Sequence, residues 1–432
     1  MALLKRRRPP AVPPVRAPRI VREFLTTEAA GGVALLVAAA VALVWANSPW
    51  REAYQTLWGT EFTVRLGRWA ITEDLTHWVN DALMALFFFV VGLEIKRELV
   101  AGELREWRTA ALPGVAAAGG MVMPALIYLA VNPGGEAARG WGIPVATDIA
   151  FAVGVLSLLG RRVPGSAKLF LLTLAVVDDI GAILIIAIFY SGGITWLPLG
   201  VAAALLGMMF ALRTARVRSM APYAVLGAGV WLAVFESGLH ATLAGVVLGL
   251  LAPARPVTPE DAALDWAADL QEDPTRENLR TMTQLAKSSV SVTERLEREL
   301  HPWTSFLVIP IFALANAGVT LDAGSLSDAA TSGVGIGVAL GLVVGKVAGI
   351  TGAVWLAVRT GLAALPEGTG WLHMVGVAAV AGIGFTVSIF VTGLAFDSTD
   401  AQEAAKIAIL AASVVASALG VAVLRAASRK AE

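Results

Sequence analysis

The sequence predicts an all-α polytopic membrane protein with about twelve transmembrane helices. Of its 432 residues, 57% are hydrophobic and only 15% are charged, and the mean hydropathy is +0.71. Apolar runs recur from residue 29 to residue 424, and most approach the roughly 20 helical residues that cross a hydrocarbon core of about 30 Å. The chain has no cysteine, which excludes disulfides and thiol chemistry from its mechanism.

The first 74 residues of the chain comprise a basic segment, an apolar segment and a polar segment, in that order. Segment 1–23 is rich in proline, lysine and arginine, so we expect a disordered cytoplasmic tail ahead of a transmembrane domain over residues 24–424. The run 29–46 is too long for the core of a signal peptide and is the first predicted span. Segment 48–74 is more polar and extracytoplasmic, and alternating apolar residues around Gly67 indicate a short β-hairpin within it.

The later spans follow at intervals along the rest of the chain. They are predicted at residues 78–93, 110–131, 143–159, 169–190, 196–212, 223–235, 239–251, 303–317, 334–358, 371–396 and 404–424. The polar segment 253–301 can hold a surface helix ending at Leu300 but cannot span, and residues 425–432 form a short tail. An even number of spans puts both termini on one side. The segments on the side of the basic N-terminus hold most of the 33 lysines and arginines, which places both termini in the cytoplasm.

Two adjacent acids, Asp178 and Asp179, lie at the centre of the span 169–190. Each costs about 2.5–3.5 kcal/mol at that depth. Neighbouring helix residues point about 100° apart, so one carboxylate can line a cavity while the other meets a countercharge on another helix. Acids inside a membrane are functional by default, which predicts cation or proton handling. The alternative is a buried ion pair that only fixes helix packing.

Two spans contain polar or flexible residues that predict breaks. Thr147 and Asp148 follow a proline inside the span 143–159, which indicates a helix interrupted at membrane depth around a cavity. Gly382, Gly384 and Thr386 indicate a second break midway through 371–396, although close helix packing would explain these glycines equally well. The broken segments are the middle members of the third-to-fifth and tenth-to-twelfth spans. These triplets begin on opposite sides of the membrane, as inverted repeats whose broken helices cross at the midplane would.

Lys346 lies at the centre of the span 334–358, among glycine and apolar residues. A buried lysine needs an acidic partner or loses its proton. The central acids available are Asp148, Asp178 and Asp179, and the sequence pattern does not choose among them.

Seven motifs are spread along the chain: NDALMA at 80–85, GLEIKREL at 92–99, ATDIAF at 146–151, DDIGA at 178–182, HATLAG at 240–245, ANAG at 315–318 and GIGFT at 382–386. Together they resemble the motifs of the NhaA-type sodium/proton antiporters, and the resemblance extends from about Phe24 to Leu424. The resemblance implies a homodimer in the bacterial plasma (inner) membrane that exchanges Na⁺ or Li⁺ electrogenically for H⁺. It implies neither a cofactor nor a nucleic-acid partner.

The resemblance also implies roles for individual residues. Asp179 would be the main ion-binding carboxylate with Asp178 beside it, and Asp148 and Thr147 would lie in the first break. Lys346 would pair with Asp178 in the inactive or proton-bound state. A cytoplasmic pH-responsive cluster would comprise Glu94, Arg97, Glu98 and Glu297, with His301 beyond. Arg298 stands where the familiar bacterial member has histidine. Because arginine keeps its proton at physiological pH, Arg298→His is expected to shift the pH profile of activity.

At such a site Na⁺ and H⁺ would compete for one carboxylate, because Na⁺ prefers oxygen ligands and a proton neutralises the same carboxylate.

Two other classes of membrane protein also use acids at the centre of their spans. An intramembrane aspartyl protease needs carboxylates on facing helices, for which Asp148 and Asp178 are candidates, and it would cleave casein in detergent. A sodium channel would carry passive flux without driving protons uphill. The sequence has no Gly-Lys-Ser/Thr phosphate loop, which argues against an ATP-driven pump.

Overall fold

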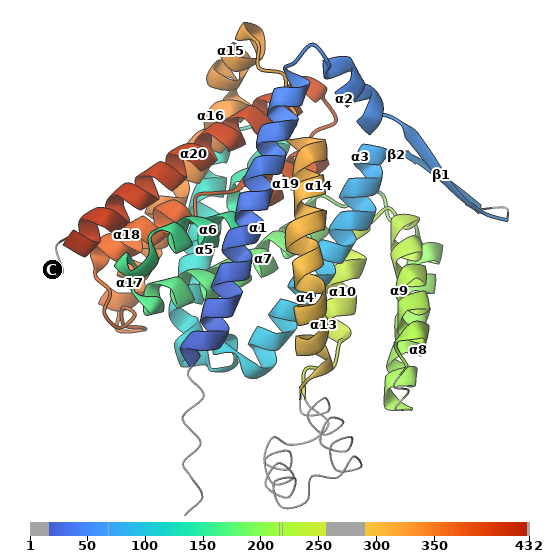
Figure 1. The fold of residues 1–432 in the computed structure, drawn as a ribbon, viewed down its shortest axis with the longest axis horizontal. Coiled ribbons are helices and arrows are strands. Elements are labelled where there is room, and N and C mark those ends of the chain that lie inside the picture. Colours follow the sequence, from blue (N-terminus) through green and yellow to red (C-terminus); the bar gives the residue numbers. More distant parts are fainter. Residues whose placement is uncertain (1–16, 68, 216, 218, 256–289, 430–432) are drawn as a thin grey trace, which may run out of the picture.

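The protein is described by a computed structural model over residues 17–67, 69–215, 217, 219–255 and 290–429. Runs of alanine, leucine, valine and glycine form helices here, because a helix satisfies its own backbone hydrogen bonds where water is absent. Within the described residues, the secondary structure is helical apart from one two-stranded hairpin (Figure 1). The protein is therefore a mostly helical membrane protein.

Six helical segments of the described chain are long and apolar enough to cross a membrane. They are Leu75–Ala101, Trp107–Val131 (α5), Gly165–Phe189 (α7), Trp196–Thr214 (α8), Gly333–Arg359 and Thr399–Arg429 (α20). The first contains α3 (Leu75–Trp78), the π-helix η1 (Val79–Leu83) and α4 (Met84–Ala101). The fifth contains α16 (Gly333–Leu340), the π-helix η6 (Gly341–Gly345) and α17 (Lys346–Arg359). Both are thus continuous candidate spans that contain a π-helical turn.

Three bent pairs raise the number of candidate spans in the described chain to nine. They are α1 (Ala17–Ala46) with α2 (Arg51–Trp58), η3 (Glu136–Val145) with α6 (Ile149–Leu158), and α18 (Trp371–Val380) with α19 (Phe385–Ala395). The remaining helices are η2 (Glu103–Arg105), η4 (Gly160–Arg162), α9 (Met220–Phe235), α10 (Thr242–Leu251), α13 (Val292–Trp303), η5 (Thr304–Val308), α14 (Ile309–Asn316) and α15 (Ala323–Thr331). Both α9 and α10 are apolar but shorter than a usual span.

Several predicted boundaries differ from the observed helices. Helix α1 begins at Ala17, inside the segment 1–23 that was expected to be disordered, and α20 continues to Arg429 through most of the expected tail 425–432. The surface helix expected to end at Leu300 continues through Trp303 into η5 and α14. Pro302 lacks an N–H group, and the π-helix η5 begins two residues later, at Thr304. The predictions for residues 1–16, 256–289 and 430–432 lie outside the described residues.

The predicted hairpin is confirmed. Strand β1 (Glu61–Leu66) pairs antiparallel with β2 (Trp69–Asp74), with Glu61 opposite Asp74. Gly67 in the connecting turn has φ +62°, a left-handed conformation that glycine adopts without strain. The hairpin extends sideways from the helices, beyond α2 and α3 (Figure 1).

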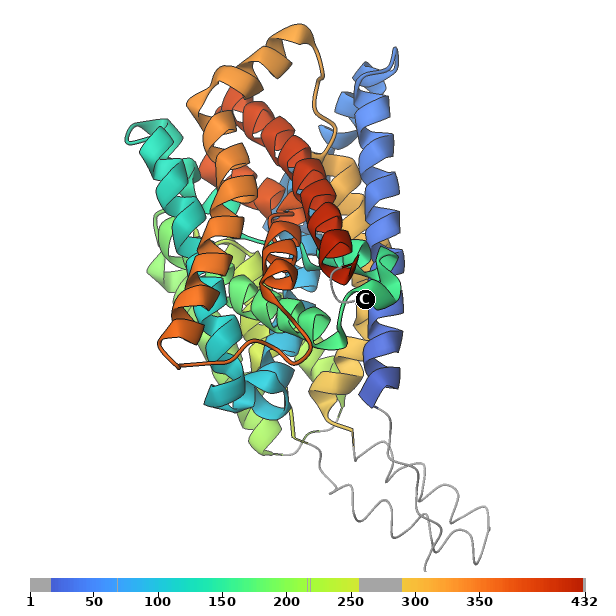
Figure 2. The same ribbon diagram turned by 90° about the vertical axis from the view of Figure 1, so that its left-hand side faces the viewer.

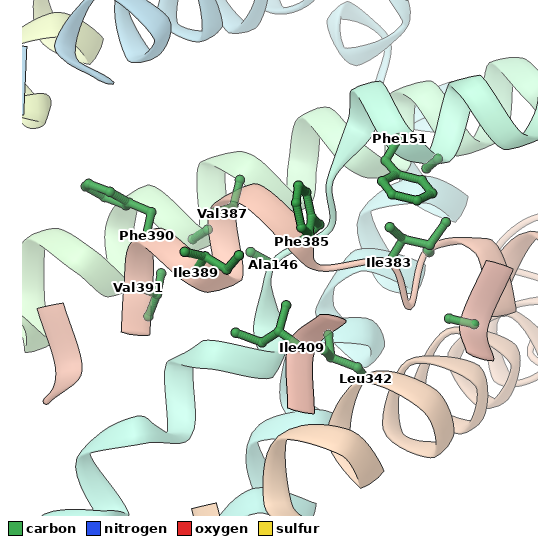
Figure 3. Close-up of a cluster of buried hydrophobic side chains, with 14 of the residues drawn as sticks. Ala146, Phe151, Leu342, Ile383, Phe385, Val387, Ile389, Phe390, Val391 and Ile409 are labelled. Atoms are coloured by element: carbon green, nitrogen blue, oxygen red, sulfur yellow. The ribbon is translucent and has the colours of Figure 1, made fainter. Parts of the chain in front are cut away.

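The hydrophobic core surrounds the break between α18 and α19. Figure 3 shows Ile383, Phe385 and Phe151 packed together there, with Leu342 of η6 and Ile409 of α20 close by. Helix α20 packs against α18 and α16 and slants across the bundle (Figure 2). The interrupted helices are thus enclosed by continuous ones, as non-helical backbone inside a membrane must be.

Candidate functional site

The two helix breaks lie against each other. The pair η3 and α6 is bent by 43° and the pair α18 and α19 by 48°. The Thr147 hydroxyl donates to the Ala381 carbonyl oxygen at 2.8 Å, and the Asp148 N–H donates to the Ile383 carbonyl oxygen at 2.7 Å. Ser388, which the sequence reasoning missed, donates from its hydroxyl to the Ile143 carbonyl oxygen at 2.7 Å. Backbone groups that the breaks release are therefore satisfied across the contact, as burial requires.

The glycines of the second break are needed for its close approach to η6. A Cβ atom on Gly382 would collide with the carbonyl oxygen of Leu342, and one on Gly384 would collide with the side chains of Ser388 and Leu342. The same two glycines therefore lie at the interruption of the helix and permit close packing there.

Asp148 joins the beginnings of both half-helices. Its Oδ1 atom accepts the Phe151 N–H at 2.9 Å and caps α6. Its Oδ2 atom accepts the Thr386 N–H at 3.0 Å and the Thr386 hydroxyl at 2.7 Å at the start of α19. A negative charge is favourable at helix N-termini, where N–H groups and the helix dipole point outward. The buried Asp148 carboxylate therefore holds α6 and α19 together.

Lys346 pairs with Asp178, as the family resemblance implied. Its Nζ atom lies 2.7 Å from Asp178 Oδ2, and the two side chains are 0% and 1% exposed. Lys346 begins α17 directly after η6, whose Gly341 and Gly345 lie close to Pro144 and Pro124. Asp178 and Asp148 therefore hold separate partners, whereas the aspartyl-protease hypothesis requires them to share one proton.

Asp179 faces a cavity instead. The cavity has a volume of about 50 Å³, larger than the roughly 10–15 Å³ that one water molecule needs. Its polar lining residues are Glu94, Thr147, Asp148, Asp179, His301, Thr304, Ser305 and Thr386. Asp179 is only 7% exposed. The carboxylate thus lies among oxygen-bearing side chains in a protein interior, which is the donor set that a small hard cation prefers.

Thr304 and Ser305 are lining residues that the sequence reasoning missed. Both are buried and belong to η5. The Thr304 hydroxyl donates to the His301 carbonyl oxygen at 2.9 Å. The available signal was a pair of hydroxyl residues directly after Trp303, at the start of an apolar run.

Residues of the expected cytoplasmic cluster lie around Arg97 and Glu297. Arg97 forms ion pairs with Glu297 and with Glu98, the second at 3.2 Å. Burial raises the pKa of the Glu297 carboxyl above its ordinary value, although Arg97 acts in the opposite direction. Glu94 and His301 also line the ion cavity, and they lie close enough to act electrostatically on Arg97 and Glu297, respectively. The charged cluster around Arg97 and Glu297 is therefore adjacent to the ion cavity.

Arg298 lies outside this cluster. Its guanidinium is 62% exposed and pairs with Glu294 at 2.7 Å, one helical turn earlier on α13. The structure thus gives Arg298 a local surface partner, whereas the next residue towards the N-terminus, Glu297, is buried against Arg97.

Comparison with known proteins identifies relatives over almost the whole chain. The model of the family described as Na+/H+ antiporter 1 matches residues 22–424. The Na(+)/H(+) antiporter NhaA 3 of Frankia alni is 48% identical over 416 residues, covering 95% of this chain and 90% of its own. The NhaA of Mesorhizobium japonicum is 49% identical, covering 94% of each chain. The NhaA of Bordetella parapertussis is 46% identical, covering 95% of this chain and 98% of its own.

Proposed function

Since the chain belongs to the Na+/H+ antiporter 1 family, we propose that it exchanges the two cations by letting them compete for the Asp179 carboxylate. The protein is a multi-pass membrane transporter whose substrates are Na⁺ and H⁺. The proposal rests on the different surroundings of the two adjacent acids. Lys346 neutralises Asp178, whereas Asp179 faces the cavity. Only one of the two central carboxylates is thus available to a transported ion.

The cavity supplies the oxygen atoms that this competition needs. The Asp179 carboxylate and the Thr147 hydroxyl line the same space. The Thr147 hydroxyl donates its own hydrogen to Ala381, so its lone pairs remain able to face a cation. Na⁺ or Li⁺ binds the ionised carboxylate, and protonation of the carboxylate releases the cation. No step requires a cofactor or ATP.

The Asp178 and Lys346 pair provides a second place for a proton. If this pair gives up or takes a proton when Na⁺ binds, more than one H⁺ moves for each Na⁺ and transport is electrogenic. The buried position of both side chains supports this role, because a change in their surroundings changes which protonation state is favoured.

For the whole molecule we propose twelve spans with both termini in the cytoplasm of a bacterial cell. The third-to-fifth and tenth-to-twelfth spans would be inverted repeats whose broken helices cross near the midplane. The contacts between the two breaks support this arrangement. Rocking of one helix group against the other would then expose the site to each side in turn.

The cytoplasmic cluster is proposed to make activity depend on pH. As pH rises through the raised pKa of Glu297, its carboxylate ionises and the buried pair with Arg97 becomes fully charged. Glu94 and His301 line the same cavity as Asp179 and act electrostatically on Arg97 and Glu297, respectively. A change in charge at Glu297 can therefore alter access to the ion site.

The test is transport by purified protein in liposomes that contain a pH-sensitive dye and a preformed acid interior. Added Na⁺ or Li⁺ should release the acid gradient, whereas K⁺ should release much less. Equal release by all three cations would contradict selective exchange. Na⁺ uptake that proceeds without any proton movement would instead indicate a channel.

A further inference from the structure

A second cavity lies apart from the ion site, at the C-terminal end of α20. Its volume is about 340 Å³ and it is lined by Arg162, Arg425, Ser428 and Arg429. Arg162 belongs to η4, the short turn between α6 and α7. Both Figures 1 and 2 show the end of α20 beside the α6–α7 region. Residues distant in sequence thus bring three guanidinium groups to one hollow.

The backbone around this hollow is fixed by hydrogen bonds. The Ser428 hydroxyl lies 2.7 Å from the Arg162 carbonyl oxygen and 3.0 Å from the Leu424 carbonyl oxygen. Arg425 and Arg429 are four residues apart, so they lie on the same side of α20. None of the three arginines forms an ion pair with a carboxylate of a described residue. The hollow therefore carries an uncompensated positive charge on a fixed frame.

Apolar surface continues from the arginines along α20. Val415 and Leu419 are 46% and 44% exposed, and Ala422 and Ala426 extend the same exposed stripe towards Arg429. Leu158, at the end of α6 just before η4, is 83% exposed. A binding partner would thus meet positive charge at one end and an apolar strip along the C-terminal part of α20 beyond it.

We propose that this cavity binds the phosphate headgroup of an anionic phospholipid, with an acyl chain along the exposed stripe of α20. The planar guanidinium groups match phosphate oxygens in shape and charge. Because α20 is a candidate span, its exposed stripe would face the bilayer, and a lipid lying along it can place its phosphate group at the arginines without leaving the membrane. In the proposed topology this end of α20 faces the cytoplasmic leaflet. The inference concerns binding alone and does not depend on the ion-exchange mechanism.

The test is native mass spectrometry of the full-length protein in detergent with added phosphatidylglycerol or phosphatidylcholine. Wild-type protein should retain phosphatidylglycerol preferentially. Arg162→Gln combined with Arg425→Gln should weaken retention by roughly fivefold for each arginine removed, which is the effect of one basic residue near an anionic surface. Arg359→Gln is the matched control, because this arginine is also exposed at a helix end but lies outside the cavity. Arg429→Gln alone provides a second variant if the double variant does not fold.

Three outcomes would overturn the assignment. The first is equal retention of phosphatidylglycerol and phosphatidylcholine by the wild type. The second is an equal loss of retention in Arg359→Gln and in the cavity variants. The third is displacement of phosphatidylglycerol by an equal concentration of inorganic phosphate, which would assign the cavity to the free ion. Because none of these readouts involves Na⁺ transport, failure here is distinguishable from failure of the proposed exchange.

Discussion

At the residue scale, the pairing of Asp178 with Lys346 makes the stability of the protein depend on both side chains. Asp178→Asn would leave the Lys346 ammonium buried without its countercharge, which should cost about 3–5 kcal/mol, as breaking other buried pairs does. Adding Lys346→Gln removes the stranded charge, so the double variant should unfold at a higher temperature than Asp178→Asn alone. Melting temperatures in detergent measure this, and absence of rescue would contradict the pairing.

The buried Glu297 carboxyl predicts a specific pH dependence of stability. Its pKa is raised above the ordinary value of 4.5, mainly by burial, so the folded protein holds this proton more tightly than the unfolded chain does. The resulting stabilisation is complete below pH 4.5 and is lost as pH rises through the raised pKa. Glu297→Gln stays neutral throughout. Its melting temperature should therefore fall less than that of the wild type between pH 4.5 and neutral pH.

Glu294→Gln is the matched control, because Glu294 lies on the same helix but pairs with Arg298 at the surface. It should leave the pH dependence of melting close to that of the wild type.

The surface position of Arg298 also revises the expectation from the sequence. Arg298→His should shift the pH profile of transport less than Glu297→Gln does. A larger shift from Arg298→His would show that Arg298 belongs to the pH-responsive cluster.

The partner of Lys346 illustrates what the sequence could not provide at this scale. Three acids lie at similar predicted depths, and the choice among them depends on how each helix is rotated. The π-turn η6 directly before Lys346 sets that rotation, and a run of glycine and apolar residues does not reveal it. The sequence also does not reveal which way the Arg298 side chain points, because its partner Glu294 lies one turn earlier on the same helix.

At the scale of elements, the contact between the two breaks depends on the Thr386 hydroxyl. Thr386→Val removes its 2.7 Å hydrogen bond to Asp148, and hydrogen bonds to charged groups contribute about 1.5–3 kcal/mol. The variant should melt at a lower temperature and exchange Na⁺ more slowly. Thr392→Val is the control, because the buried Thr392 hydroxyl donates only to Ser388 within the same helix. Equal effects of the two substitutions would contradict a special role for the contact.

Local signals explain which elements the sequence predicted. The hairpin follows from alternating residues around Gly67, and the breaks follow from polar and glycine residues inside apolar runs. The union of α13, η5 and α14 into one helical stretch was not predicted, because the change from polar to apolar residues near Trp303 resembles an ordinary loop boundary. Neither segment by itself encodes the mutual contact of the breaks, and the sequence indicated it only through the matching positions of the two segments in their triplets of spans.

At the scale of the whole molecule, we propose that the hairpin is a surface for pairing two copies of the chain. Both strands of a two-stranded sheet are edge strands, and Phe62 and Val64 of β1 are 53% and 45% exposed. Phe62→Ser combined with Val64→Ser should lower the dimer fraction measured by light scattering in detergent. Each protomer holds its own ion cavity, so exchange per protomer should be retained. An unchanged dimer fraction would exclude these side chains from the interface.

The central claim is that Na⁺ and H⁺ compete for Asp179. The most direct measurement is the release of protons when NaCl is added to purified protein in weakly buffered detergent solution, followed with a pH dye and compared between wild type and Asp179→Asn. The wild type should release protons, and its apparent affinity for Na⁺ should weaken by up to about tenfold for each unit that the pH falls while one proton competes. Asp179→Asn, which keeps the side-chain size and leaves the Asp178 and Lys346 pair intact, should fold and release no protons. Proton release by Asp179→Asn equal to that of the wild type would contradict the claim.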